Sequence, residues 1–166
     1  MEDDLSYEEL EQIKQNAEHC ENIAELRKKG AKAKAKSAKL AEKKMKLKAK
    51  HLKLISQANV LEGKSDNLEE KADSAEEKGD LLESEARGQD KEQASKTEYK
   101  AAKKDAKAAT YDKKAAKKDA KAAKLRLKAK RLETIEAEYH REKKKHDAES
   151  KAYFERAEKM DRDKTC

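Results

Sequence analysis

The chain has 166 residues, 48% of them charged, and its formal net charge at pH 7 is +7. Leu, Ile, Val and Phe make up only about 12% of the residues, below the roughly 20% expected of a chain with a large compact core. Pro and Trp are absent and there are four Gly, which excludes Pro-rich and Gly-rich linkers. We therefore predict an all-α, elongated long-helix or coiled-coil protein with no compact globular core.

The first predicted element is an acidic N-terminal helix within residues 1–29. The run Ser6-Tyr-Glu-Glu9 has the form of a capping box and predicts that the helix begins there. The two cysteines, Cys20 and Cys166, lie far apart and predict no disulfide framework; we expect a small buried apolar group and a tail thiol. The apolar side, with Ile23 and Leu26 beside it, consists of Leu10, Ile13, Ala17, Cys20 and Ala24.

The second predicted element, residues 30–88, carries apolar residues at a strict interval of seven, which is the spacing of a helix-pairing seam. An apolar line of this period is buried along its whole length only if a partner helix coils around the first helix and covers it. The line contains Ala33, Leu40, Leu47, Leu54, Leu61, Leu68, Ala75 and Leu82. We predict that its six leucines, referred to below as the seam leucines, pair this helix with another.

Two further lines accompany the seam leucines. One is a basic line that we expect to dock on acidic surfaces: Lys32, Lys36, Lys39, Lys43, Lys46, Lys50 and Lys53. The other is the apolar line Ala38, Met45 and Leu52, about 150° from the leucines on a helix of 3.5 residues per turn. This apolar line favours a helix among several neighbours; the alternative is a set of isolated exposed residues.

The four glycines predict helix breaks near Gly30, Gly63, Gly79 and Gly88. The last three are each followed by an acid that could cap a new helix. Because the seven-residue line keeps its phase through Gly63 and Gly79 but not beyond Gly88, we expect the true boundary at Gly88. Gly63 and Gly79 are then expected to be kinks or stutters.

The third predicted element, residues 89–166, is a long helix rich in Ala and Lys. It contains an internal duplication, because the nine residues 101–109 recur identically at 115–123. The period of fourteen is two heptads and produces two lines. One line is Ala101, Ala108, Ala115, Ala122 and Ala129, and the other is Tyr111, Leu125, Leu132, Tyr139, Tyr153 and Met160.

The sign of the charge changes in blocks along the chain. Acids dominate residues 1–26 and 54–93, bases dominate 27–53 and 94–131, and 132–166 are nearly balanced. Unlike blocks can face each other if the chain folds back or if neighbouring chains are staggered. We therefore expect antiparallel or staggered packing of the helices.

No catalytic constellation, phosphate loop or metal box is recognisable, so we expect no enzyme activity, no cofactor and no metal. The N-terminus has no signal-peptide pattern and no stretch approaches the roughly 18 apolar residues of a membrane span. These features favour a soluble protein of the cytoplasm or nucleus, or one inside a virus particle. We expect a non-enzymatic structural or scaffolding protein that acts as a helical rod or clamp. Its alternating charge blocks would dock on other subunits of an assembly such as a cytoskeletal lattice or a virus particle. A homo-oligomer remains an open alternative.

Two other functions are suggested by resemblance. The Lys-rich stretches 43–50 and 124–131 resemble linker-histone tails, which implies sequence-independent binding or compaction of nucleic acid. Residues 96–107 resemble disordered desiccation-protective chains of the late-embryogenesis type, although that family repeats every eleven residues rather than fourteen. The C-terminal residues that we expect to dock on protein or phosphate are Lys124, Arg126, Lys128, Lys130 and Arg131.

Overall fold

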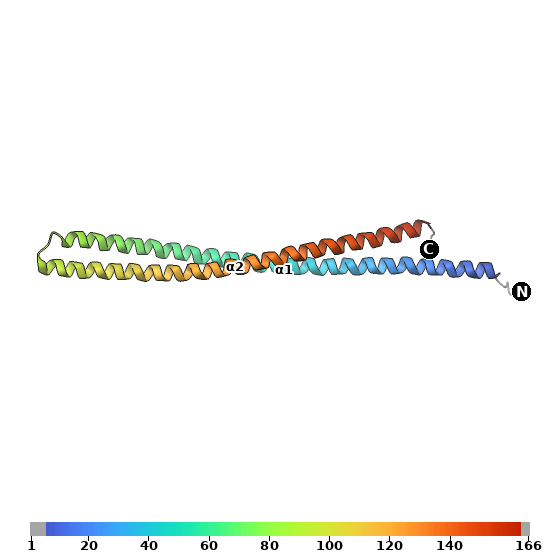
Figure 1. The fold of residues 1–166 in the computed structure, drawn as a ribbon, viewed down its shortest axis with the longest axis horizontal. Coiled ribbons are helices and arrows are strands. Elements are labelled where there is room, and N and C mark those ends of the chain that lie inside the picture. The colour runs from blue at the N-terminus through green and yellow to red at the C-terminus, as the bar shows by residue number, and fades with distance from the viewer. Residues whose placement is uncertain (1–5, 164–166) are drawn as a thin grey trace. The chain divides into compact units, whose positions relative to one another are not determined.

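The structure, a computed structural model, describes residues 6–163 and contains two long helices within them, α1 (Tyr7–Ala86) and α2 (Lys91–Asp163) (Figure 1). No strand occurs in this part of the chain, and the predicted all-α class with long helices is confirmed. The expected division between residues 29 and 30 lies within α1, whereas the one between 88 and 89 lies in the connection between the helices.

A side-chain cap begins each helix. The Ser6 N–H donates to Glu9 Oε2 at 2.8 Å, and the Glu9 N–H donates to Ser6 Oγ at 3.3 Å, so the predicted capping box is confirmed. At the start of α2, Asp90 Oδ1 accepts from the N–H groups of Glu92 and Gln93 at 3.1 and 3.0 Å. These contacts satisfy amide groups that have no partner inside the helix.

The predicted break near Gly88 is confirmed, but the breaks expected near Gly30, Gly63 and Gly79 are wrong, because α1 continues through all three. Gly30 and Gly79 lie where α1 packs closely against α2. A Cβ added to Gly30 would lie 3.0 Å from Phe154 Cε2, and one added to Gly79 would collide with Asp105 Oδ1. A mid-helix glycine costs about 1 kcal/mol relative to Ala, and here the close approach of the second helix offsets that cost.

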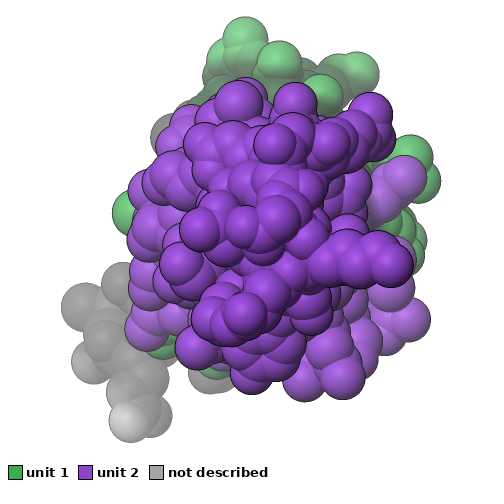
Figure 2. All heavy atoms as spheres, turned by 90° about the vertical axis from the view of Figure 1, so that its left-hand side faces the viewer, with its two compact units in different colours: residues 1–48, 134–166 green, residues 49–133 purple. Residues whose placement is uncertain are grey.

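Two compact units divide the chain (Figure 2): unit 1 contains Met1–Lys48 and Thr134–Cys166, and unit 2 contains Ala49–Glu133. In unit 1, His19 Nε2 lies 3.0 Å from the Met160 carbonyl oxygen and Arg27 pairs with Asp161 at 2.7 Å. Lys43 lies over the Tyr139 ring, so rising numbers in α1 meet falling numbers in α2. The pairing within the unit is antiparallel, as predicted.

Unit 2 is also an antiparallel pair, and small residues form its most buried contacts. Ala72, Ala75 and Ala108 form a buried cluster against which Tyr111 packs. The buried small residues of α1 in this unit are Ala58, Ser65, Ala72, Ala75, Gly79 and Ala86. Those of α2 are Ala101, Ala108, Ala115, Ala122 and Ala129, the whole of the predicted alanine line. Small side chains let the two backbones approach closely, so this pair is narrow.

Gly63 differs from Gly30 and Gly79 because no atom lies within 4 Å of a Cβ added there. We therefore expect Gly63→Ala to stabilise the protein by about 1 kcal/mol, since Ala restricts the unfolded chain and favours the helix. The measurement is urea unfolding followed by circular dichroism at 222 nm. Gly30→Ala is the matched control, and its gain should be smaller because Phe154 must move. Equal gains at the two sites would contradict this account.

Candidate docking surface

The seam leucines lie beside the closest contacts between the helices rather than in them. All six are half-buried, whereas Ala33 and Ala75 on the same line are buried. The six are Leu40, Leu47, Leu54, Leu61, Leu68 and Leu82. Part of each leucine surface therefore remains in contact with solvent in this chain.

Sequence reasoning missed a second line of α1, which lies deeper in the contact with α2. Its members also recur every seven residues: Ile23, Gly30, Ser37, Lys44, His51, Ala58, Ser65, Ala72, Gly79 and Ala86. All are buried except Lys44 and His51, which are half-buried. In the sequence, this line is visible as glycines, serines and alanines at heptad spacing. The glycines, however, predict helix breaks when they are considered alone.

Serine hydroxyls on these deep faces bond directly to the backbone of the opposite helix. Ser65 Oγ donates to the Ala115 carbonyl oxygen in unit 2, and Ser150 Oγ donates to the Gly30 carbonyl oxygen in unit 1, both at 3.0 Å. A side chain as short as serine reaches the other backbone only where the helices approach closely. These bonds also satisfy the buried hydroxyl groups, which would otherwise destabilise the contact.

In unit 1 the charges of the two helices do not cancel. Residues 27–48 contain eleven bases and one acid, whereas residues 134–161, which include the facing part of α2, contain seven bases and eight acids. The lysines of the predicted basic line are all exposed, in unit 1 (Lys32, Lys36, Lys39, Lys43 and Lys46) and in unit 2 (Lys50 and Lys53). Residues 27–48 of α1 therefore have a strongly positive surface, in contrast to the acidic residues before them on the same helix.

Local contacts engage only some of these lysines. Lys43 Nζ lies 5.9 Å from the centre of the Tyr139 ring, and Lys46 pairs with Glu42 of the same helix at 2.5 Å. On α2, Asp147 accepts from Lys143 at 2.6 Å and also from the Ser37 hydroxyl. The Lys143 and Ser37 hydrogen bonds lower the pKa of the Asp147 carboxyl group.

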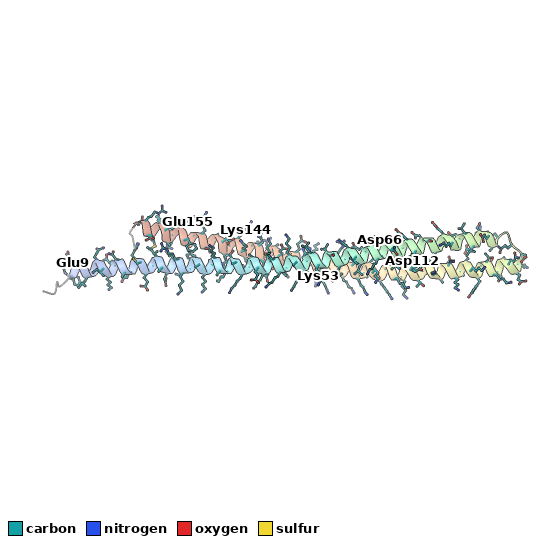
Figure 3. The ribbon with its side chains drawn as sticks, turned by 180° about the vertical axis from the view of Figure 1, so that it is seen from behind. Glu9, Lys53, Asp66, Asp112, Lys144 and Glu155 are labelled. Carbon is teal, nitrogen blue, oxygen red and sulfur yellow. The ribbon has the colours of Figure 1, made fainter. Side chains whose placement is uncertain are left out.

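His140 reports the positive potential of unit 1. The nearby charge of Lys44 is the largest cause of a lowered His140 pKa. Desolvation and the charges of Lys144 and Lys143 lower it further, and Glu136 partly opposes them. Figure 3 labels Lys144 on α2. Bases from both helices thus gather around one imidazole, which is an arrangement suited to an anionic partner.

In unit 2, by contrast, the charge blocks face each other. Residues 54–93 contain twelve acids and five bases, and residues 94–131 contain fifteen bases and four acids. Arg126 donates from Nε and Nη2 to the Glu62 carboxylate, each at 2.6 Å, and from Nη2 to Asn59 Oδ1 at 3.0 Å. The bond from Arg126 lowers the pKa of Glu62. The acidic block of unit 2 therefore compensates a large part of the charge of the basic block within the chain.

The five basic residues predicted to dock in the C-terminal half are all exposed and belong to unit 2: Lys124, Arg126, Lys128, Lys130 and Arg131. Arg126 is engaged with Glu62, so this group does not act as one uniform docking site. The structure divides the predicted docking residues between the two units. Within unit 1, the positive charge that α2 does not compensate lies in residues 27–48.

Cys20 is half-buried and disulfide-bonded, so the expectation that it is a simple buried apolar group is wrong; Cys166 lies outside the described residues. Within residues 6–163, no three His, Cys, Asp or Glu side chains are grouped as metal ligands. Neither described helix has a stretch apolar enough to cross a membrane.

The chain was also compared with known proteins. No family model, curated protein or solved structure matches it.

Proposed function

We propose that this chain is a non-enzymatic structural protein, a helical rod or clamp that docks on an acidic protein surface within a larger assembly. The observation that supports the proposal most directly is the uncompensated positive charge of residues 27–48 in unit 1. Eleven bases in this stretch meet a stretch of α2 whose charge is nearly balanced. An acidic partner would supply the kind of compensation that the basic block of unit 2 obtains in part from the acidic block it faces.

The packing supports the same function. The deep contacts consist mainly of small residues, and no buried side-chain polar atom in the described residues lacks a hydrogen-bond partner. The helix pairs therefore hold themselves together without placing their basic side chains in the interior. Those side chains stay exposed for a partner, as a docking protein requires.

The cluster around His140 favours a second candidate, sequence-independent binding of nucleic acid. The charges of Lys44, Lys144 and Lys143 lower the pKa of His140, and a phosphate that bound near these lysines would release counterions. Against this candidate, the basic residues of 27–48 are nearly all lysine, which does not offer the bidentate phosphate contacts of arginine.

One experiment separates the two candidates: a 20-base-pair duplex is added at physiological salt while the His140 pKa is followed by NMR. If the chain docks on protein, we expect no retardation of the duplex by micromolar protein and no change in the His140 pKa. Tight binding that weakens steeply with salt, together with a rise in the His140 pKa, would favour nucleic acid and contradict the primary proposal.

The Lys44→Ala variant is the control for the NMR readout. It should raise the His140 pKa in the absence of duplex, because Lys44 is the largest cause of the lowered value. The helix content of the chain alone should be high by circular dichroism. A disordered spectrum in water would support the stress-protective alternative instead.

A further inference from the structure

The outward side of α1 in unit 1 carries an apolar line that no described residue covers. Ala38 and Met45, from the apolar line that the sequence predicts beside the seam leucines, belong to a longer series at an interval of seven, whose members in unit 1 are Leu10, Ala17, Ala24, Ala31, Ala38 and Met45. Leu10 is 52% exposed and Met45 is 73% exposed, and the four alanines are also exposed. A line of period seven on a helix is suited to contact with another helix.

The residue that follows each member of this line is charged, and its sign changes once, at the middle. Glutamates follow the first three members and lysines follow the last three: Glu11, Glu18, Glu25, Lys32, Lys39 and Lys46. All six are exposed. Within unit 1, the acidic half and the basic half of this face are therefore mirror images in charge, with equal numbers and equal spacing, and the next member, Leu52 followed by Lys53, belongs to unit 2.

The described part of α2 leaves the N-terminal end of this face uncovered. Every residue from Ser6 to Glu18 is exposed, and the first described contact of α1 with α2 is made by His19. Figure 3 shows Glu9 on the segment of α1 that extends past the last described residue of α2. The acidic half of the face is thus accessible to a partner helix.

We propose that this face binds a second copy of the chain as an antiparallel, two-fold symmetric pair of α1 helices. Leu10 of one copy would meet Met45 of the other, with Ala17 against Ala38 and Ala24 against Ala31. Each contact then occurs twice, as a self-complementary two-fold interface requires. The inference rests on the proposed function and identifies the acidic surface as the sister copy's α1.

The charges select this direction. In an antiparallel pair, positions that follow the contact line on one helix face the same positions on the other helix. Glu11 therefore faces Lys46 of the second copy, and Glu18 faces Lys39. A parallel pair in register would instead place these positions on opposite sides of the contact line, so that the glutamates and lysines could not pair.

Two bases, Arg27 and Lys28, lie close to the two-fold axis, and each would approach its own counterpart there. The Arg27 guanidinium group is already paired with Asp161 of α2 at 2.7 Å, which compensates its charge, whereas repulsion between the two copies of Lys28 weakens the pair. Because alanines bury little apolar area and exposed ion pairs are screened, the dimer should be weak and sensitive to salt.

The test is a charge reversal followed by mixing, read out by sedimentation velocity of the full chain at low salt. One variant carries Glu11→Lys, Glu18→Lys and Glu25→Lys, and the other carries Lys32→Glu, Lys39→Glu and Lys46→Glu. Each variant alone should dimerise at least about tenfold more weakly than the unmodified chain, because like charges then face each other along the whole line. An equimolar mixture should regain the dimer, because every facing pair is again unlike.

A matched control carries Glu69→Lys, Glu76→Lys and Glu83→Lys, which change the net charge by the same amount at exposed positions of unit 2. This control should dimerise like the unmodified chain. Circular dichroism on all variants checks that the helices are intact. An unmodified chain that stays monomeric at about 100 μM and low salt, or a mixture that fails to associate, overturns the proposal.

A zero-length carboxyl-to-amine cross-link shows whether the two α1 helices pair in antiparallel or parallel direction. Glu11 and Lys46 lie on one helix about 52 Å apart at 1.5 Å per residue, so a cross-link between them joins two copies. Links of Glu11 to Lys46 and Glu18 to Lys39 are expected, and links of Glu11 to Lys32 would show a parallel stagger and overturn the antiparallel pair. A monomeric chain refutes only this inference, whereas tight duplex binding refutes the proposed function.

Discussion

Ile23→Ala should lower the free energy of unfolding of unit 1 by about 2 to 4 kcal/mol. Ile23 is 2% exposed and is the largest of the almost fully buried side chains in the described residues. Its removal leaves a cavity in a narrow contact where few neighbouring side chains can move to fill the space. Hydrogen exchange of peptides from residues 19–48 and 134–161, measured with increasing urea, would report the loss.

Ile13→Ala is the matched control, because Ile13 is in the same helix but is 54% exposed. The change should alter the free energy of unfolding by less than about 0.5 kcal/mol. The comparison removes the effect of exchanging Ile for Ala in a helix, since both substitutions make that exchange. Equal losses at the two positions would contradict the burial that the structure assigns to Ile23.

Ala115→Leu should destabilise unit 2 by about 1 to 3 kcal/mol, although leucine is the larger apolar residue. Ala115 is 2% exposed, and its carbonyl oxygen accepts the Ser65 hydroxyl at 3.0 Å. Three additional carbon atoms would push the helices apart and lengthen this bond. Urea unfolding followed by circular dichroism, with hydrogen exchange of the residues around Ser65, would measure the effect.

The duplicated segment supplies its own control, because the adjacent Ala116 is exposed. Ala116→Leu should leave the stability of unit 2 nearly unchanged, since Ala and Leu have similar helix propensities and the side chain points away from α1. The same contrast should hold for Ala122 and Ala123. If Ala115→Leu stabilised the protein, the helices would not be held together by small residues.

Much of the fold follows from the sequence because helix signals are local. The absence of Pro, the capping box at Ser6 and the change of phase at Gly88 were sufficient to predict long helices and the position of the turn. The charge blocks predicted antiparallel or staggered packing, and the structure has the antiparallel arrangement, in which the chain folds back and residues 54–93 face 94–131. These predictions needed no knowledge of packing distances.

The glycines and the deep contacts could not be predicted in the same way. Whether Gly30 or Gly79 ends a helix depends on how closely a second helix approaches it, and that distance is a tertiary property. The seam leucines were predicted to form the helix contact because they are large. The line of glycines, serines and alanines nevertheless lies deeper in the contact. Large side chains flank a close helix contact because the space between the two backbones holds only small ones.

The alanine line of α2 has a consequence for how the length of this chain can change. Its buried members repeat every seven residues, and the duplicated segment spans two such periods. Gain or loss of fourteen residues there would return the same kind of side chain to every position that faces α1, so the helix pair could lengthen without redesign. Sliding α2 by seven residues would also keep alanine against α1, and only specific pairs such as Glu62 with Arg126, together with the short turn at residues 87–90, oppose that slip.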